Sequence, residues 1–89
     1  MSTFKDKVVL VTGGASGIGY LLGKKSLVKG ADHLIIWDIN SDLLEDACTK
    51  LTDSGYNVFT QKVDVSNPME VERAAALTLQ KFYMVHILF

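Results

Sequence analysis

One stretch of the chain decides its fold: Val8-Val9-Leu10-Val11-Thr12-Gly13-Gly14-Ala15-Ser16-Gly17-Ile18-Gly19. Its first four residues are apolar, which is typical of a strand buried on both faces, as in a parallel sheet. A glycine turn follows, and we expect a helix from about Ser16 to Lys29, with Gly30 just past its end. A helix that starts after such a turn leaves backbone N–H groups free, and these groups bind a diphosphate.

The rest of the chain alternates between strand and helix patterns. The expected strands are 7–12, 33–38, 57–63 and 85–89. The second helix follows a cap at Asn40 or Ser41 and ends at Ser54-Gly55. The third starts at a cap on Asn67, with Pro68 in its first position and Glu70 three residues after the cap. The order β-α-β-α-β-α-β predicts an α/β fold with a parallel sheet and right-handed crossovers.

Composition limits the function. The 89 residues carry a net charge of −1, and the two signs are interspersed. This excludes the basic surface that nucleic acids or anionic membranes require. No apolar run reaches the roughly 18 residues of a spanning helix. A lone cysteine, Cys48, and a polar start at Met1–Lys7 predict a soluble chain in a reducing, cytoplasmic environment.

The glycine spacing is Thr-Gly-x-x-x-Gly-x-Gly. Gly13 suits a sharp turn out of the strand, while Gly17 and Gly19 let the backbone approach a pyrophosphate and pack the helix on the sheet. A P-loop would need Lys and then Ser or Thr after its last glycine, but Tyr20 follows Gly19. The remaining alternative is a structural turn that binds no ligand.

Asp38 ends the second strand, nineteen positions after Gly19. A carboxylate there accepts hydrogen bonds from an adenosine ribose and repels a 2′-phosphate, so it selects NAD over NADP. Ile39 and Ser16 offer no cation to a 2′-phosphate either. A helix-capping or loop role for Asp38 is the alternative.

Asp64 and Val65 follow the third strand, where a loop of a doubly wound sheet reaches the adenine edge of the cleft. Asp64 is placed to meet an exocyclic amine, and Val65 to cover a ring face. From the residues alone, turn chemistry before the third helix is an equally good interpretation of this Asp.

For the histidines, the cysteine and the tryptophan, the sequence pattern favours structural roles. His33 and His86 lack partners at ligand spacing, so we assign no metal site. The apolar stripe of the second helix includes Leu43 and Cys48, which predicts a core position for the thiol. Core packing is also the expectation for Trp37.

Together, the motif Thr12–Gly19, Asp38 and Asp64-Val65 resemble the short-chain dehydrogenase/reductase family, over about Lys5 to Phe89. The resemblance implies a Rossmann-type fold, NAD(P) and hydride transfer between an alcohol and a carbonyl. It also implies adenine contacts for Asp64 and Val65, and places Ser16 and Ile18 beside the cofactor phosphates and nicotinamide. More loosely, residues 37–40 resemble the retinol and 17β-hydroxysteroid dehydrogenase branch.

The chain departs from the family pattern at its end. The family continues after its fourth strand with Asn-Ala-Gly and, much later, a catalytic Ser and Tyr-x-x-x-Lys. Tyr20 and Lys24 match the last pattern by spacing, but they lie in the first helix. We therefore assign no catalytic residue, and expect residues 1–89 to be the N-terminal dinucleotide-binding half of a Rossmann-type domain, truncated at strand 4.

Three hypotheses follow from the residues. The chain is part of an NAD-dependent dehydrogenase, whose small or lipid-like alcohol or carbonyl substrate and homo-oligomeric contacts belong to a longer parent. Alternatively, it is a non-catalytic nucleotide-binding module. In the third, it associates with a full-length relative through the open edge of its last strand.

Overall fold

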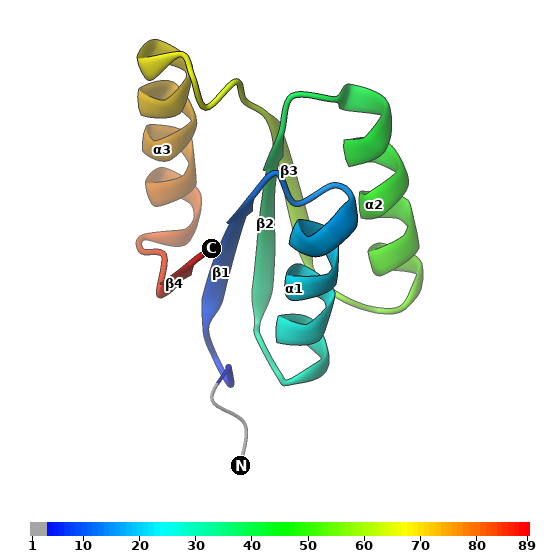
Figure 1. Cartoon of the computed structure of the whole chain (residues 1–89). Coiled ribbons are helices and arrows are strands. Elements are labelled where there is room, and N and C mark those ends of the chain that lie inside the picture. Colours follow the sequence, from blue (N-terminus) through cyan, green and yellow to red (C-terminus); the bar gives the residue numbers. More distant parts are fainter. Residues whose placement is uncertain (1–3) are drawn as a thin grey trace.

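A four-stranded parallel sheet separates one helix from two others in the computed structural model, which describes residues 4–89 (Figure 1). In chain order the elements are β1 (Val8–Thr12), α1 (Gly17–Val28), β2 (His33–Asp38), α2 (Ser41–Asp53), β3 (Val58–Lys62), α3 (Pro68–Phe82) and β4 (Ile87–Leu88). Helices α1 and α2 cover one face of the sheet, and α3 covers the other. The predicted α/β class, element order and parallel sheet are confirmed.

The strands lie in the order β3-β2-β1-β4. In the β1–β2 register, Val8 lies opposite His33 and Thr12 lies opposite Trp37. Three strands are shorter than predicted. The clearest case is the last, since Val85, His86 and Phe89 fall outside β4. Its ladder still extends by hydrogen bonds from the His86 N–H to the Val8 carbonyl and from the Phe89 N–H to the Leu10 carbonyl, both 2.9 Å.

The core forms two layers because every other residue of each strand faces the same side. One layer, between the sheet and α1 and α2, contains Val9, Val11, Leu34, Ile36, Leu27, Leu44, Ala47 and Leu51. The other, between the sheet and α3, contains Val8, Leu10, Ile35, Trp37, Val63 and Ala74. The predicted core role of Trp37 is confirmed.

The buried stripe of α2 is narrower than predicted. It consists of Leu44, Ala47 and Leu51, which lie on one helix face. Leu43 is exposed and Cys48 is only half-buried, so the core position predicted for the thiol is wrong. The two residues flank the stripe on a helix whose outer face meets solvent.

Asparagine side chains cap two helices as predicted. The Asn40 Oδ1 accepts the Leu43 N–H at 3.0 Å, and the Asn67 Oδ1 accepts the Met69 N–H at 3.0 Å. The reciprocal half of a capping box, suggested by Glu70, is not formed. The Asn67 N–H already donates to the Asp64 carbonyl at 2.9 Å. Glu70 instead accepts the Asp64 N–H at 3.2 Å.

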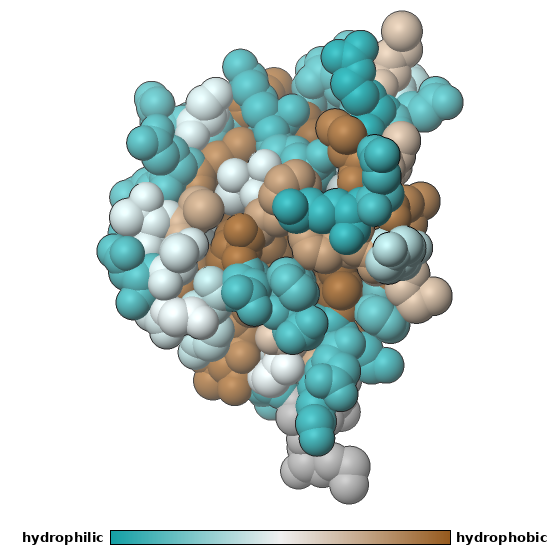
Figure 2. Space-filling model, turned by 180° about the vertical axis from the view of Figure 1, so that it is seen from behind, coloured by the Kyte–Doolittle hydropathy of each residue, from teal (hydrophilic) through white to brown (hydrophobic). Residues whose placement is uncertain are grey.

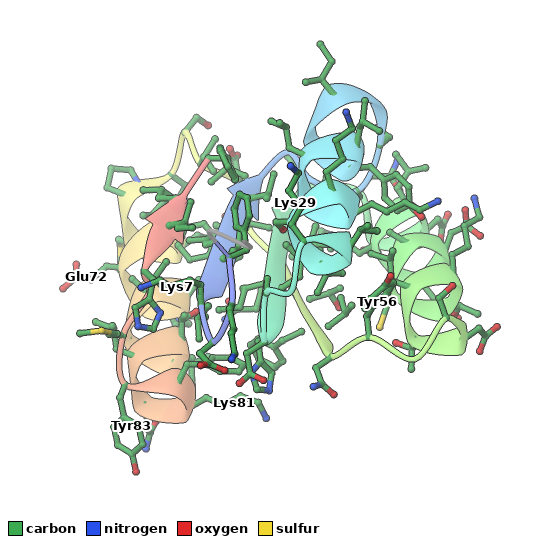
Figure 3. The ribbon with its side chains drawn as sticks, turned by 90° about the horizontal axis from the view of Figure 1, so that it is seen from below. Lys7, Lys29, Tyr56, Glu72, Lys81 and Tyr83 are labelled. Carbon is green, nitrogen blue, oxygen red and sulfur yellow. The ribbon has the colours of Figure 1, made fainter. Side chains whose placement is uncertain are left out.

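Aromatic rings pack against one another at the end of the sheet where β2 and β3 begin. The rings of His33 and Phe82 lie 5.1 Å apart, and those of Phe59 and Phe82 lie 5.7 Å apart. The Lys81 ammonium sits 5.0 Å from the centre of the Phe59 ring. Figure 3 shows Lys81 reaching from α3 below the sheet, while Tyr83 points away from it. This end of the molecule is therefore held by ring packing and a cation–π contact.

The surface mixes polar and apolar side chains. Figure 2 shows apolar side chains both near the middle and toward the edges of the rear face, interspersed with polar ones. Among the described residues, no helix combines the length and apolar character that crossing a bilayer requires.

Candidate functional site

The carboxyl ends of β1, β2 and β3 meet at one edge of the sheet. From β1 the chain crosses to β2 on one side, and later returns to place β4 on the other side. A parallel sheet binds ligands outside the carboxyl ends of its strands, at such a reversal of direction. The glycine turn, Asp38 and the Asp64-Val65 loop all lie at this edge.

The glycine turn is hydrogen-bonded to the end of β2. The N–H groups of Gly13 and Gly14 donate to the Trp37 carbonyl, at 2.7 and 3.3 Å. Gly13 and Gly17 have φ angles of +65° and +59°, in the left-handed region that a side chain disfavours. The predicted sharp turn at Gly13 is therefore present.

Gly19 gives α1 its closest approach to the turn. A Cβ at this position would collide with the carbonyl oxygen of Gly13, and it would lie 3.0 Å from the Gly14 Cα. Two further glycines, which the motif did not single out, pack closely against side chains of β2. A Cβ on Gly14 would lie 3.0 Å from Ile36 Cγ2, and one on Gly23 would lie 2.9 Å from Leu34 Cδ2. The sequence carries a signal for Gly23, which follows Gly19 by one helical turn.

The start of α1 presents free donors. Within residues 4–89, the N–H groups of Gly17, Ile18 and Gly19 donate to no protein group, and the first helical bond runs from the Tyr20 N–H to the Ser16 carbonyl at 3.3 Å. The Ser16 side chain makes no capping bond, and the first turn carries no acidic residue. The positive end of the helix dipole and three unpaired donors suit a diphosphate.

Asp38 connects the end of β2 to both neighbouring loops. Its Oδ2 accepts the Ala15 N–H at 3.2 Å, and its Oδ1 accepts the Asn40 N–H at 3.1 Å. A carboxylate offers about four acceptor positions, so both oxygens can still accept from a ligand hydroxyl. The neighbouring Ile39 is 59% exposed and brings no charge to the site.

Asp64 takes part in turn chemistry. Its Oδ1 accepts the Ser66 hydroxyl at 2.6 Å and the Ser66 N–H at 2.9 Å. These bonds, the hydroxyl first, lower the pKa of the Asp64 carboxyl below its ordinary value. Its Oδ2 makes no hydrogen bond within the described part of the chain. The turn role therefore leaves one carboxylate oxygen available.

The predicted site residues divide into three groups. Four of them line one hollow of about 170 Å³, which is formed by Gly13, Asp38, Ile39, Val63, Asp64 and Val65. Ser16 and Gly17 line a neighbouring hollow of about 250 Å³, together with Tyr20 and Asp46. Ile18 is 77% exposed and, like Gly19, lines neither hollow. The structure thus gathers most of these residues along one edge.

The two histidines, for which the sequence predicts no metal site, each have a polar partner within the chain. His33 Nδ1 lies 3.1 Å from the Asp32 carboxylate, and His86 Nδ1 accepts the Val8 N–H at 3.0 Å. No three His, Cys, Asp or Glu side chains among residues 4–89 form a group that could hold a metal ion.

Sequence reasoning missed two contacts that support this edge. Glu70 fixes the backbone at Asp64, and Gln61 on β3 accepts the indole N–H of Trp37 at 2.6 Å. The position of Glu70 in the first turn of α3 could have indicated a contact with the preceding loop. No sequence pattern marks Gln61.

The model of the short chain dehydrogenase family matches residues 7–89. L-rhamnose 1-dehydrogenase (NADP(+)) of Thermoplasma acidophilum is 32% identical over 88 residues, covering 99% of this chain and 35% of that protein. Estradiol 17-beta-dehydrogenase 11 of Pongo abelii is 38% identical over 69 residues, covering 78% of this chain and 23% of that protein. A short chain dehydrogenase/reductase from Burkholderia phymatum, solved in complex with NAD, superposes with a TM-score of 0.92.

That structure is 32% identical and covers all of this chain, which spans 31% of it. The chain thus spans about a third of the length of the curated relatives that it matches. Members of this family bind NAD(P), and the matched region is their nucleotide-binding portion. Fold, glycine turn and family model agree, and the chain belongs to the short chain dehydrogenase family.

Proposed function

We propose that this chain binds NAD at the carboxyl edge of its sheet, and that residues 1–89 form the N-terminal half of a dinucleotide-binding domain. The proposed contacts are Gly13, Ser16, Gly17, Ile18, Gly19, Asp38, Asp64 and Val65. In a longer protein, the bound nicotinamide would exchange a hydride with an alcohol or carbonyl substrate. We assign catalysis to no residue of these 89.

Asp38 is the observation that carries the preference for NAD. It is held at the site by the Ala15 and Asn40 N–H groups, and retains acceptor positions for two ribose hydroxyls. A 2′-phosphate in the same place would meet its negative charge. Because the relatives include an NADP-dependent enzyme and an NAD complex, the preference rests on this chain's own residues.

The remaining contacts follow from chemistry along the edge. The N–H groups of residues 17–19 are oriented to bind the diphosphate. Val65 is 59% exposed beside the Asp38 hollow, which suits it to cover the adenine face. We assign Ile18, which is 77% exposed, to the nicotinamide end. The single cysteine supports a reducing compartment such as the cytoplasm.

Calorimetric titration of the chain with NAD and with NADP tests this proposal. We expect NAD to bind more tightly. Asp38→Ala should weaken NAD binding by roughly 10- to 150-fold, since hydrogen bonds to a charged group contribute about 1.5–3 kcal/mol. Asp53→Ala, at an exposed carboxylate on α2, is the matched control and should bind as the wild type does.

Two results would overturn the proposal. One is a folded wild-type chain that binds neither nucleotide. The other is an Asp38→Ala variant whose affinity for NAD equals that of the Asp53→Ala control.

A further inference from the structure

Gln61 joins β2, β3 and α3 through one amide group. It lies directly opposite Trp37 in the β2–β3 register. Its Oε1 accepts the Trp37 indole N–H at 2.6 Å, and its Nε2 donates to the Ala74 carbonyl at 3.3 Å. The Thr78 hydroxyl lies 2.9 Å from the same Oε1 and 2.8 Å from the Ala74 carbonyl, and its one hydrogen can be donated to only one of these two oxygens. Since an indole N–H can only donate, this contact fixes which end of the amide faces Trp37.

Trp37 is also the residue that anchors the glycine turn. Its backbone carbonyl accepts the N–H groups of Gly13 and Gly14, and the next residue is Asp38. The same residue therefore has its main chain in the nucleotide site and its side chain bonded to Gln61. The indole that Gln61 contacts is thus attached to the backbone that carries both the carbonyl and, one residue on, Asp38.

Because Trp37 is buried, its hydrogen bond to Gln61 restricts the orientation of the indole ring. Trp37 is only 5% exposed and packs in the core layer on the α3 side of the sheet, with Val63 and Ala74. Within residues 4–89, the indole N–H donates to Gln61 Oε1 alone. A buried donor without a partner is costly, so the ring is held in the one orientation that reaches Gln61.

We propose that Gln61 is a positioning residue of the nucleotide site, acting through Trp37. It holds the indole, and the indole holds the carbonyl that orders the turn and the backbone that presents Asp38. This inference rests on the proposed binding of NAD for its functional consequence. The coupling between Gln61 and the turn is a property of the free chain and can be measured without nucleotide.

Two substitutions separate the hydrogen bond from the packing. Gln61→Met keeps a similar length and removes both the acceptor for the indole and the donor to the Ala74 carbonyl. Gln61→Glu keeps the acceptor for the indole and removes only the donor. Gln80→Met, at an exposed position of α3, is the control for the Met substitution. Trp37 is the only tryptophan, so its indole N–H gives a single resolved signal in a nitrogen-15 NMR spectrum.

For Gln61→Met we expect the indole N–H and the Gly13 amide to exchange with solvent roughly fivefold faster, and the dissociation constant for NAD to rise by a similar factor. Gln80→Met should stay close to the wild type in all three measurements. Gln61→Glu should give smaller changes than Gln61→Met, because it keeps the acceptor for the indole and loses only the donor to the Ala74 carbonyl. If Gln61→Met does not fold, Trp37→Phe removes the donor while keeping an aromatic ring, and the same faster exchange is expected at Gly13.

Unchanged Gly13 exchange in a folded Gln61→Met chain would overturn the inference. Equal effects of Gln61→Met and Gln61→Glu would overturn it too, since packing alone would then explain both. If the wild type binds no NAD but the exchange difference is present, the coupling stands and the proposed function fails.

Discussion

The carboxylate of Asp38 is hydrogen-bonded to the backbone of Ala15, with 3.2 Å between Oδ2 and the amide nitrogen. This bond connects the end of β2 to the glycine turn through groups of the chain itself. The acceptor proposed to recognise the ribose is thus already oriented by the loop proposed to bind the phosphates. Preorganisation of this kind lowers the cost of ordering the site on binding.

Replacing Asp38 with Ser and Ile39 with Arg should reverse the coenzyme preference. The double variant removes the negative charge and supplies a guanidinium, which suits a phosphate. We expect its affinity for NADP to exceed that for NAD in calorimetric titration. Ile39→Arg alone is the control and should still prefer NAD, because the Asp38 carboxylate remains. A double variant that keeps the wild-type preference would contradict the role given to Asp38.

Gly19→Ala should destabilise the chain by about 2–3 kcal/mol, although alanine favours helices, because its Cβ meets the backbone carbonyl of Gly13. In Gly17→Ala the new Cβ has no atom within 4 Å, so the loss of stability comes only from the positive φ and should be about 1–2 kcal/mol. Urea unfolding of both variants measures the difference. Equal midpoints would mean that α1 moves away from the turn at little cost.

Asn67→Ala should cost about 1 kcal/mol of stability, since the side chain accepts the Met69 and Glu70 N–H groups at the start of α3. Ser16→Ala should change the stability of the free chain by less than about 0.5 kcal/mol, because that hydroxyl caps nothing. Thermal unfolding without nucleotide compares the two. A larger loss for Ser16→Ala would show that a cap forms there in solution.

Ser66→Ala should raise the pKa of Asp64 toward its ordinary value, since the Ser66 hydroxyl is the main cause of its lowering. A carboxyl whose pKa is lowered by folding stabilises the native chain at pH values above its unfolded pKa of 3.8. That contribution is lost as the pH falls through the lower pKa of the folded chain. NMR titration of the Asp64 carboxyl carbon measures the shift. An identical titration in both proteins would rule out the Ser66 hydroxyl as its cause.

Much of the fold was predictable because its signals are local. The apolar run at Val8–Val11, the asparagine caps and Gly30 each act through neighbouring residues, and each lies where predicted. The ends of strands were less predictable, because pairing depends on a partner far away in the sequence. The last strand is an example, since β4 contains only Ile87 and Leu88 of the expected residues 85–89.

Within the candidate site, the turn at Gly13 and the position of Asp38 at the end of β2 were predictable, because glycine and charge mark them in the sequence. Its supporting contacts were not, because they depend on the distance between elements. Glu70 has the spacing of a capping box, yet the Asn67 N–H donates to the Asp64 carbonyl and not to the Glu70 side chain. Gln61 becomes significant only when α3 is packed over β3.

The pairing of Thr12 with Trp37 makes the chain unequally tolerant of changes in length. A residue inserted within β1 or β2 would move one strand past the other by about 3.3 Å and turn its buried side chains to the opposite face. It would also separate the Gly13 N–H from the Trp37 carbonyl. An insertion at the exposed Ser54-Gly55 turn disturbs neither, so length variants should be accepted there and rejected in the paired strands.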